Sequence, residues 1–202
     1  MHTPRTTLLT STLIALGLCV GCDQLSESLD VDIVTDYTFP AAIDVGAVTG
    51  GTAGTVAPAQ VSKDLAVPAQ DVDLVKEAPA LKDAKGRVKS IELTKISALP
   101  KTNTVTGVLP AFDIYIGALG NTDVKNAFKI ATIPAIPAGS NTVVNATIDA
   151  EGTKSAQQFL TTLAFSQMLV AKLVVEKGES IPGGEADLNV TLGLKAVLNP
   201  VK

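Results

Sequence analysis

Apolar and polar positions alternate with a period of two along much of this chain, and that pattern predicts β-strands. Between Leu29 and Phe39, apolar residues fall on one side while Asp30, Asp32 and Asp36 fall on the other. Similar segments follow, separated by Gly, Pro and Asn turns roughly every eight to twelve residues, and we expect strands at 88–98, 112–118, 128–133, 142–149, 168–176 and 186–198. This spacing favours an all-β fold, an antiparallel immunoglobulin-like β-sandwich with one short helix.

Two early segments are less regular. Residues 40–60 are rich in Ala, Gly, Thr and Val and fit either a flexible loop or two strands joined by a turn at Gly50. We favour the strands, because a pure linker would lack the apolar residues found here. Prolines interrupt 62–86, which we interpret as irregular connections with a short helical piece at 80–85 that ends at Gly86.

One segment has the period of an amphipathic helix instead. A single apolar stripe follows the spacing i, i+3, i+4, i+7, i+8, formed by Ala156, Phe159, Leu160, Leu163 and Ala164. Ser155 and Gln158 fit a capping box at its start. Insertion into a membrane is the alternative use of such a stripe, but Lys154 is the only basic residue near it, so we expect the helix to pack over one end of the sandwich.

The first twenty-two residues have the order of properties of an export signal. A short segment carrying Arg5 precedes the uncharged stretch 8–20, which is too short to span a bilayer but fits the hydrophobic region of a signal peptide. An ordinary secretory peptide cut after Gly17 is one reading. It would leave Cys19 and Cys22 as a CxxC pair, for which no second cysteine or histidine pair exists elsewhere.

The residues Leu18-Cys19-Val20-Gly21-Cys22 favour another reading, because they resemble the lipobox of bacterial lipoproteins. The family usually has Leu where this chain has Cys19. The resemblance implies cleavage after Gly21 by signal peptidase II and acylation of Cys22 with chains such as palmitate. It also implies a signal peptide at 1–21, a lipidated cysteine with a short tether at 22–28, and a single β-sandwich domain at 29–202.

Composition limits the chemistry of the remaining chain. After residues 1–21 are removed there is no histidine, no tryptophan and one arginine, Arg87, so an imidazole base and His-containing metal sites are excluded. The aromatic residues are two Tyr and five Phe, few for a sugar-binding cleft. We therefore expect no enzyme, no catalytic residues, no cofactor and no metal.

The distribution of charge does not point to a particular kind of partner. The net charge of −4 is spread over mixed signs, and the basic residues between 76 and 95 alternate with acids, which predicts a solvated face and no nucleic-acid partner. The similar segments 30–34 and 71–75 carry alternating aspartates that could form calcium ligands. Without the glycine and closing glutamate of a calcium loop, we interpret them as the wet faces of strands.

These features together predict a membrane-anchored lipoprotein of the bacterial cell envelope, with the outer membrane favoured over the inner one. Its partner would be the membrane, reached through the lipid on Cys22, and it would act as a structural or protein-interaction module. The alternative is a carrier or sensor of an apolar, lipid-like ligand, because an interior rich in small aliphatic residues could leave a cavity.

The intact mass of the exported protein tests the lipobox. We expect the mature chain to start at Cys22 and to carry acyl mass, and Cys22→Ser to abolish that mass. A chain that starts at Leu18 with no added mass would instead identify an ordinary secretory signal and retain the CxxC pair.

Overall fold

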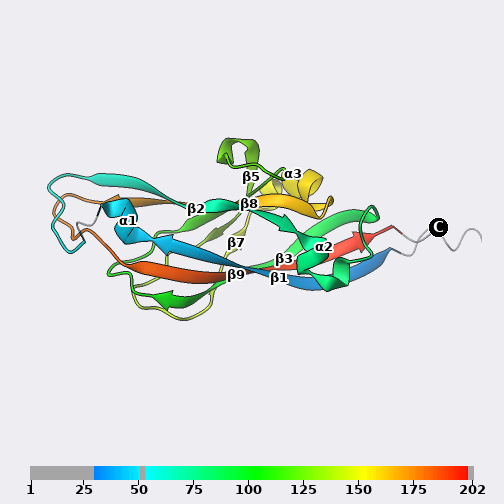
Figure 1. Cartoon of the computed structure of the whole chain (residues 1–202), viewed down its shortest axis with the longest axis horizontal. Helices are drawn as coiled ribbons and strands as arrows, with labels where there is room; N and C mark the ends of the chain where they lie inside the picture. Colours follow the sequence, from blue (N-terminus) through cyan, green and yellow to red (C-terminus); the bar gives the residue numbers. More distant parts are fainter. Residues whose placement is uncertain (1–29, 51–52, 200–202) are drawn as a thin grey trace, which may run out of the picture.

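Two antiparallel sheets face each other in the computed structural model, which describes residues 30–50 and 53–199 (Figure 1). One sheet has the strand order β1-β9-β3-β6 and the other β2-β8-β4-β5-β7. The strands are β1 (Val31–Asp44), β2 (Val61–Asp73), β3 (Val88–Asn103), β4 (Phe112–Gly117), β5 (Ala127–Ile133), β6 (Val144–Asn145), β7 (Thr147–Ile148), β8 (Ala164–Val175) and β9 (Glu185–Leu198). The helices are α1 (Val45–Thr49), α2 (Leu74–Glu77) and α3 (Ala150–Leu160), with 3₁₀ turns η1 (Pro79–Leu81) and η2 (Val124–Asn126). The predicted antiparallel β-sandwich is confirmed.

The pairing of β1 with β9 sets the long axis of the molecule. Their register runs without a shift from Val31 opposite Leu198 to Asp44 opposite Glu185. Fourteen residues of strand span roughly 46 Å. Both described ends of the chain therefore lie at one end of the molecule, which we call the terminal end; α1 lies at the opposite, distal end (Figure 1).

Alternation buries one face of each strand, as the sequence predicted. In β9 the inward side chains are fully buried, namely Leu188, Val190, Leu192 and Leu194. They meet the inner face of the other sheet in one continuous aliphatic core, which also contains Phe112 and Phe165. Apolar burial of this kind is the main favourable term in folding.

The outer face of the first sheet is polar and carries ion pairs across the strands. Lys195 Nζ lies 2.9 Å from Asp32 Oδ2, and Lys95 Nζ lies 3.1 Å from Asp36 Oδ2. Gly193 of β9 lies between Lys95 and Asp36 in the register, and a Cβ there would lie 2.7 Å from Lys95 Cγ. The missing side chain lets the lysine reach across the central strand. The predicted solvated face of mixed charge is present.

The two long sides of the sandwich differ. On one side, β6 pairs with β3 and β7 pairs with β5, so the chain crosses from one sheet to the other. Helix α3 contacts strands of both sheets on this side. On the opposite side, β1 and β2 are the outermost strands, and no strand within the described ranges crosses between them.

The prediction of two strands joined at Gly50 is wrong. Ile43 belongs to the end of β1, and helix α1 follows at once, ending at Gly50 with a φ of 73°. Asp44 caps the helix by accepting from Ala47 N at 2.7 Å. The amide of Val45 donates to Gly184 O at 3.0 Å, so a residue distant in sequence holds this corner.

The irregular connection predicted for 62–86 is partly wrong. Residues 61–73 form the long strand β2, which passes through Pro68 at a register shift between Val67 and Gln70. Proline is tolerated there because β2 is an edge strand. The short helical piece is η1 at Pro79–Leu81, and Gly86 follows with a φ of 77°.

Helix α3 begins earlier than the capping box predicted. Its N-cap is Asp149, whose Oδ1 accepts from Gly152 N at 2.9 Å, so Ser155 and Gln158 lie inside the helix. Leu163 is in a left-handed turn, with a φ of 61°, after the helix has ended. Part of the predicted stripe holds, because Ala156 and Leu160 are fully buried. The helix closes one side of the sandwich rather than an end.

Gly152 marks the closest approach of α3 to β5, and a Cβ at this position would overlap Lys129 O. Gly→Ala in a helix normally stabilises by about 0.5–1 kcal/mol. Here we expect Gly152→Ala to lower the free energy of unfolding by about 1–3 kcal/mol, because the backbone of β5 must move. Urea denaturation measures the change.

Gly46 in α1 is the matched control, since its added Cβ would meet atoms no nearer than 3.3 Å. We expect Gly46→Ala to change the free energy of unfolding by less than about 1 kcal/mol, because only the Asp44 carboxylate must shift slightly. Equal effects of the two substitutions would contradict the packing argument.

Candidate functional site

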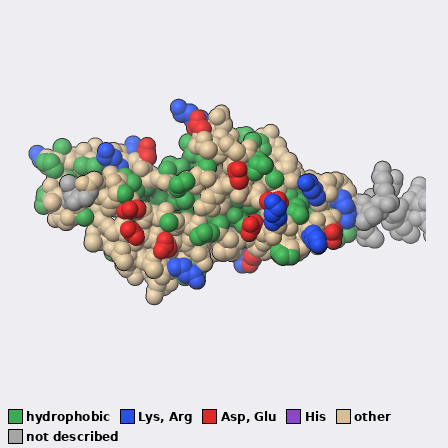
Figure 2. Space-filling view, viewed as in Figure 1, with side chains coloured by type: hydrophobic (Ala, Val, Ile, Leu, Met, Phe, Trp, Pro, Cys, Tyr) green, Lys and Arg blue, Asp and Glu red, His purple; other side chains and the backbone are tan. Residues whose placement is uncertain are grey.

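The candidate site is the open side of the sandwich between the edge strands β1 and β2, which we call the seam. The two strands belong to different sheets and come together only here. Figure 2 shows hydrophobic side chains along the strip between them. Towards the terminal end, β1 contacts η1, so the accessible part of the seam is its distal half.

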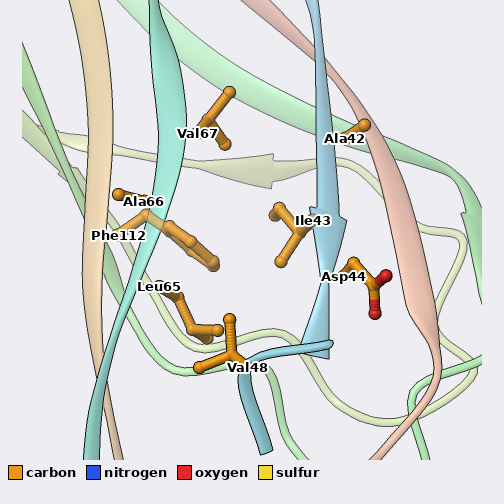
Figure 3. A pocket seen from close by; sticks show the side chains of 8 residues that line it. All are labelled: Ala42, Ile43, Asp44, Val48, Leu65, Ala66, Val67 and Phe112. Carbon is orange, nitrogen blue, oxygen red and sulfur yellow. The ribbon is translucent and has the colours of Figure 1, made fainter. Parts of the chain in front are cut away.

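A small cavity opens in this distal half (Figure 3). Side chains from β1, α1, β2 and β4 surround it, namely Ala42, Ile43, Asp44, Val48, Leu65, Ala66, Val67 and Phe112. Its volume is about 40 Å³. A water molecule needs about 10–15 Å³ on the same measure, so the space fits the end of one branched aliphatic side chain.

The lining of the cavity is almost entirely apolar. In Figure 3, Ile43 projects from β1 toward Leu65 and Val67 of β2, while the carboxylate of Asp44 points away from the space. That carboxylate is engaged as the cap of α1. The cavity therefore offers van der Waals contact and no group suited to acid–base or nucleophilic chemistry.

A polar cluster lies further along the seam. Gln70 Nε2 donates to Pro40 O at 3.2 Å and thereby connects β2 to β1. Gln167 Nε2 of β8 lies 3.3 Å from Tyr37 Oη and 3.4 Å from Gln70 Oε1. Gln167 is 1% exposed, and its Oε1 has no hydrogen-bond partner among residues 30–50 and 53–199. These three side chains hold the seam together next to the cavity.

Burial raises the pKa of the Tyr37 hydroxyl. The hydrogen bond from Gln167 lowers this pKa by a smaller amount, and the negative charge of Glu77 raises it further. The neutral phenol is therefore the form that this environment favours. Ionisation would place an anion between the two sheets, where few polar groups could solvate it.

The sequence did not identify this cluster, although one signal was available. Gln167 occupies an inward position of β8, between Phe165 and Leu169, where the period-two pattern calls for an apolar side chain. A polar residue at such a position is informative because it must find hydrogen-bond partners inside the fold. The partner residues Tyr37 and Gln70 come from distant strands and could not be assigned from spacing.

The aspartates considered as calcium ligands already bind other groups of the protein. Asp32 pairs with Lys195, and Asp71 accepts from Gly120 N at 3.0 Å and from the Ser166 hydroxyl. These hydrogen bonds hold the pKa of Asp71 below its usual value. Within the described ranges, no group of three or more His, Cys, Asp or Glu side chains is arranged to hold a metal ion.

The lipid-carrier alternative is wrong for this cavity. A site for a lipid-sized ligand needs several hundred Å³ of largely enclosed space, whereas the seam cavity has about 40 Å³. The sequence-predicted Cys22 and its cleavage site at Gly21 lie outside the described residues, so lipidation stays a prediction. None of the helices in residues 30–50 and 53–199 is long and apolar enough to cross a membrane.

Comparisons with known proteins found distant structural similarity only. No family model matches the chain, and no curated protein matches it. A chain from the structure of Mud crab tombus-like virus is similar over 100% of this chain and 94% of its own length, with 7% identity and a TM-score of 0.38. A chain of tobacco necrosis virus is similar over 85% of this chain and 98% of its own, with 9% identity and a TM-score of 0.31.

These findings correct the function predicted from the sequence. The sequence predicted a membrane-anchored lipoprotein of the bacterial cell envelope with the membrane as its partner, and the structures found come from viruses. The predicted function, partner and location are withdrawn on this finding. At such low identity and TM-score, the likeness itself assigns no partner, assembly or activity to this chain.

Alkaline unfolding tests the environment of Tyr37. Because the folded state raises the pKa of this phenol, the unfolded state, with an ordinary pKa of about 10, ionises first as the pH rises. The stability that the neutral phenol contributes is present below that pH and is lost above it. We expect Tyr37→Phe to reduce the fall in unfolding free energy between pH 8 and pH 11, as measured by urea titration. An unchanged fall would show that burial does not perturb the group.

Proposed function

We propose that this protein is a non-enzymatic binding module that recognises an extended segment of another polypeptide at the seam. The observation that carries the proposal is the apolar cavity between two edge strands, because it combines a pocket for one side chain with the adjoining backbone of a sheet edge. Strand addition at a sheet edge uses this combination: backbone hydrogen bonds give affinity and pockets for alternate side chains give specificity.

The direction of the β1 backbone supports the proposal. Proline has no N–H and is accommodated in a strand where that position faces away from the neighbouring strand. Pro40 O accepts from Gln70 across the seam, so the backbone at Pro40 faces away from β9. Residues two apart in a strand face the same way, so the peptide groups of Thr38 and Ala42 also point into the seam.

The surroundings of the cavity indicate the chemistry of the segment. Asp44 lies opposite Glu185 in the register, and Ala42 lies opposite Asp187, so three carboxylates share the outer face beside the cavity. Figure 2 shows acidic side chains gathered next to the distal part of β1. A small aliphatic residue flanked by Lys or Arg would match both the pocket and this charge.

Selection from a displayed library of random peptides, about twelve residues long, tests the proposal. We expect enriched peptides to carry Val, Ile or Leu next to basic residues. Val48 of α1 is half-buried and its side chain points into the cavity (Figure 3), so Val48→Phe would fill it. We expect this variant to weaken binding at least tenfold, which is about 1.4 kcal/mol, in a direct titration with an enriched peptide.

Ala47→Phe is the matched control, because Ala47 is an exposed residue of the same helix outside the cavity lining. It should bind within about twofold of the unchanged protein. Failure to enrich any peptide, or equal binding to both variants, would overturn the proposal.

A further inference from the structure

A second edge of the first sheet is completed by a side chain instead of a strand. On the side of β3 away from β9, Ile91 N donates to Gln157 Oε1 at 2.9 Å, and Gln157 Nε2 donates to Ile91 O. The carboxamide of this α3 residue thus accepts and donates as the peptide group of a neighbouring strand would. Strand-like pairing on this edge is therefore already present in the structure at Ile91.

The same edge is paired again further along β3. Ala146 N donates to Ile96 O at 2.9 Å, and β6 pairs with β3 from Ser97 onward. Beyond Ala146 the chain leaves this edge, because Ile148 pairs with Ala131 of the other sheet. Both β7 and α3 still contact β3, and within the described ranges the carboxamide of Gln157 makes the next hydrogen bonds to its backbone, at Ile91.

Leu93 lies between these two contacts, and its backbone faces the gap. The register from Ile91 opposite Ala196 to Leu93 opposite Leu194 is uninterrupted. Residues two apart in a strand direct their N–H and C=O to the same side. Since Ile91 uses both groups to bind Gln157, the N–H and C=O of Leu93 also point away from β9.

A surface depression of about 410 Å³ lies beside Leu93, between β3 and α3. Its lining includes Leu93, Ile148, Ala150 and Thr153, with Glu92 and Lys154 as the charged residues. Ile91 and Ile96 are about 13 Å apart along the strand, allowing for one bulged residue at about 3.3 Å per residue. That length fits roughly three residues of extended chain.

We propose that this depression is a second peptide-binding site, in which an extended segment of a partner protein adds to the edge of β3. The central residue of the segment exchanges two backbone hydrogen bonds with Leu93. The segment then lies between the Gln157 carboxamide, which binds Ile91, and Ala146, which binds Ile96. Together the three form a row of hydrogen-bonding partners along the edge of β3. The carboxamide on Ile91 is the structural argument for this occupant, because it makes the contacts of a peptide group on the adjacent position.

The inference is independent of the seam, since it involves a different edge of a different strand. It also predicts a different kind of ligand selectivity. Backbone hydrogen bonds provide most of the recognition here, because the side chains of Ile91 and Leu93 are buried in the core and form no pocket for a partner residue. Binding should consequently depend on the backbone of the ligand more than on its sequence.

An NMR titration of the ¹⁵N-labelled protein with the capped tripeptide acetyl-Val-Thr-Val-amide tests the proposal. We expect the Leu93 amide signal to move downfield and to saturate, because its N–H gains a hydrogen bond. The same peptide with an N-methyl group on the central threonine lacks the required N–H donor. We expect it to bind at least tenfold more weakly, and this comparison requires no change in the protein.

Ala150→Trp supplies the protein-side test, because Ala150 is exposed and lines the depression. It should abolish the Leu93 shift, whereas Ser155→Trp, at an exposed position of the same helix outside the lining, should retain it. Val48→Phe at the seam should also leave the shift unchanged. An unmoved Leu93 amide, or equal binding of the N-methylated peptide, would overturn the proposal.

Discussion

The peptide groups at the edges of the two sheets impose the constraint on which the rest of this structure depends. Each outer strand has a row of N–H and C=O groups that needs partners from the protein or from water. The molecule meets this need differently on each side: β6 and β7 join the sheets, the Gln157 carboxamide binds Ile91, and Gln70 binds Pro40 across the seam. Both proposed binding sites lie beside these contacts, where the edge of a sheet is no longer covered by the protein's own groups.

The strands were predictable because alternation is a local property. From Val88 onward the predicted segments coincide with strands of the sandwich, and only 142–149 divides into the two short strands β6 and β7. The errors arise where distant residues decide the local conformation. Gly184 O accepts from Val45 N and helps to fix a helix where the local sequence suggested a strand, and β2 accommodates Pro68 because of its place at the sheet edge. Neither the helix after β1 nor the strand through Pro68 could be predicted from the neighbouring residues alone.

The candidate sites were less accessible to sequence reasoning. Composition excluded much catalytic chemistry, but it gave no indication of a cavity that combines side chains from β1, α1, β2 and β4. The carboxamide of Gln157 is similar: on a helical wheel it is an ordinary polar residue, and only the packing of α3 against β3 places it on Ile91. Gln167 was also missed, because the predicted strand began at residue 168, whereas β8 begins at Ala164. Only a strand that includes Gln167 reveals a polar residue at an inward position.

The register of β1 and β9 also determines how this molecule would respond to mechanical load. Val31 lies opposite Leu198, so the described chain enters and leaves the fold at one end, on neighbouring strands. A force that separates the two ends would break the β1–β9 ladder one pair after another, like a zipper, and would not shear all its hydrogen bonds together. The molecule would thus yield readily when pulled by both ends, although its aliphatic core is continuous from one end to the other.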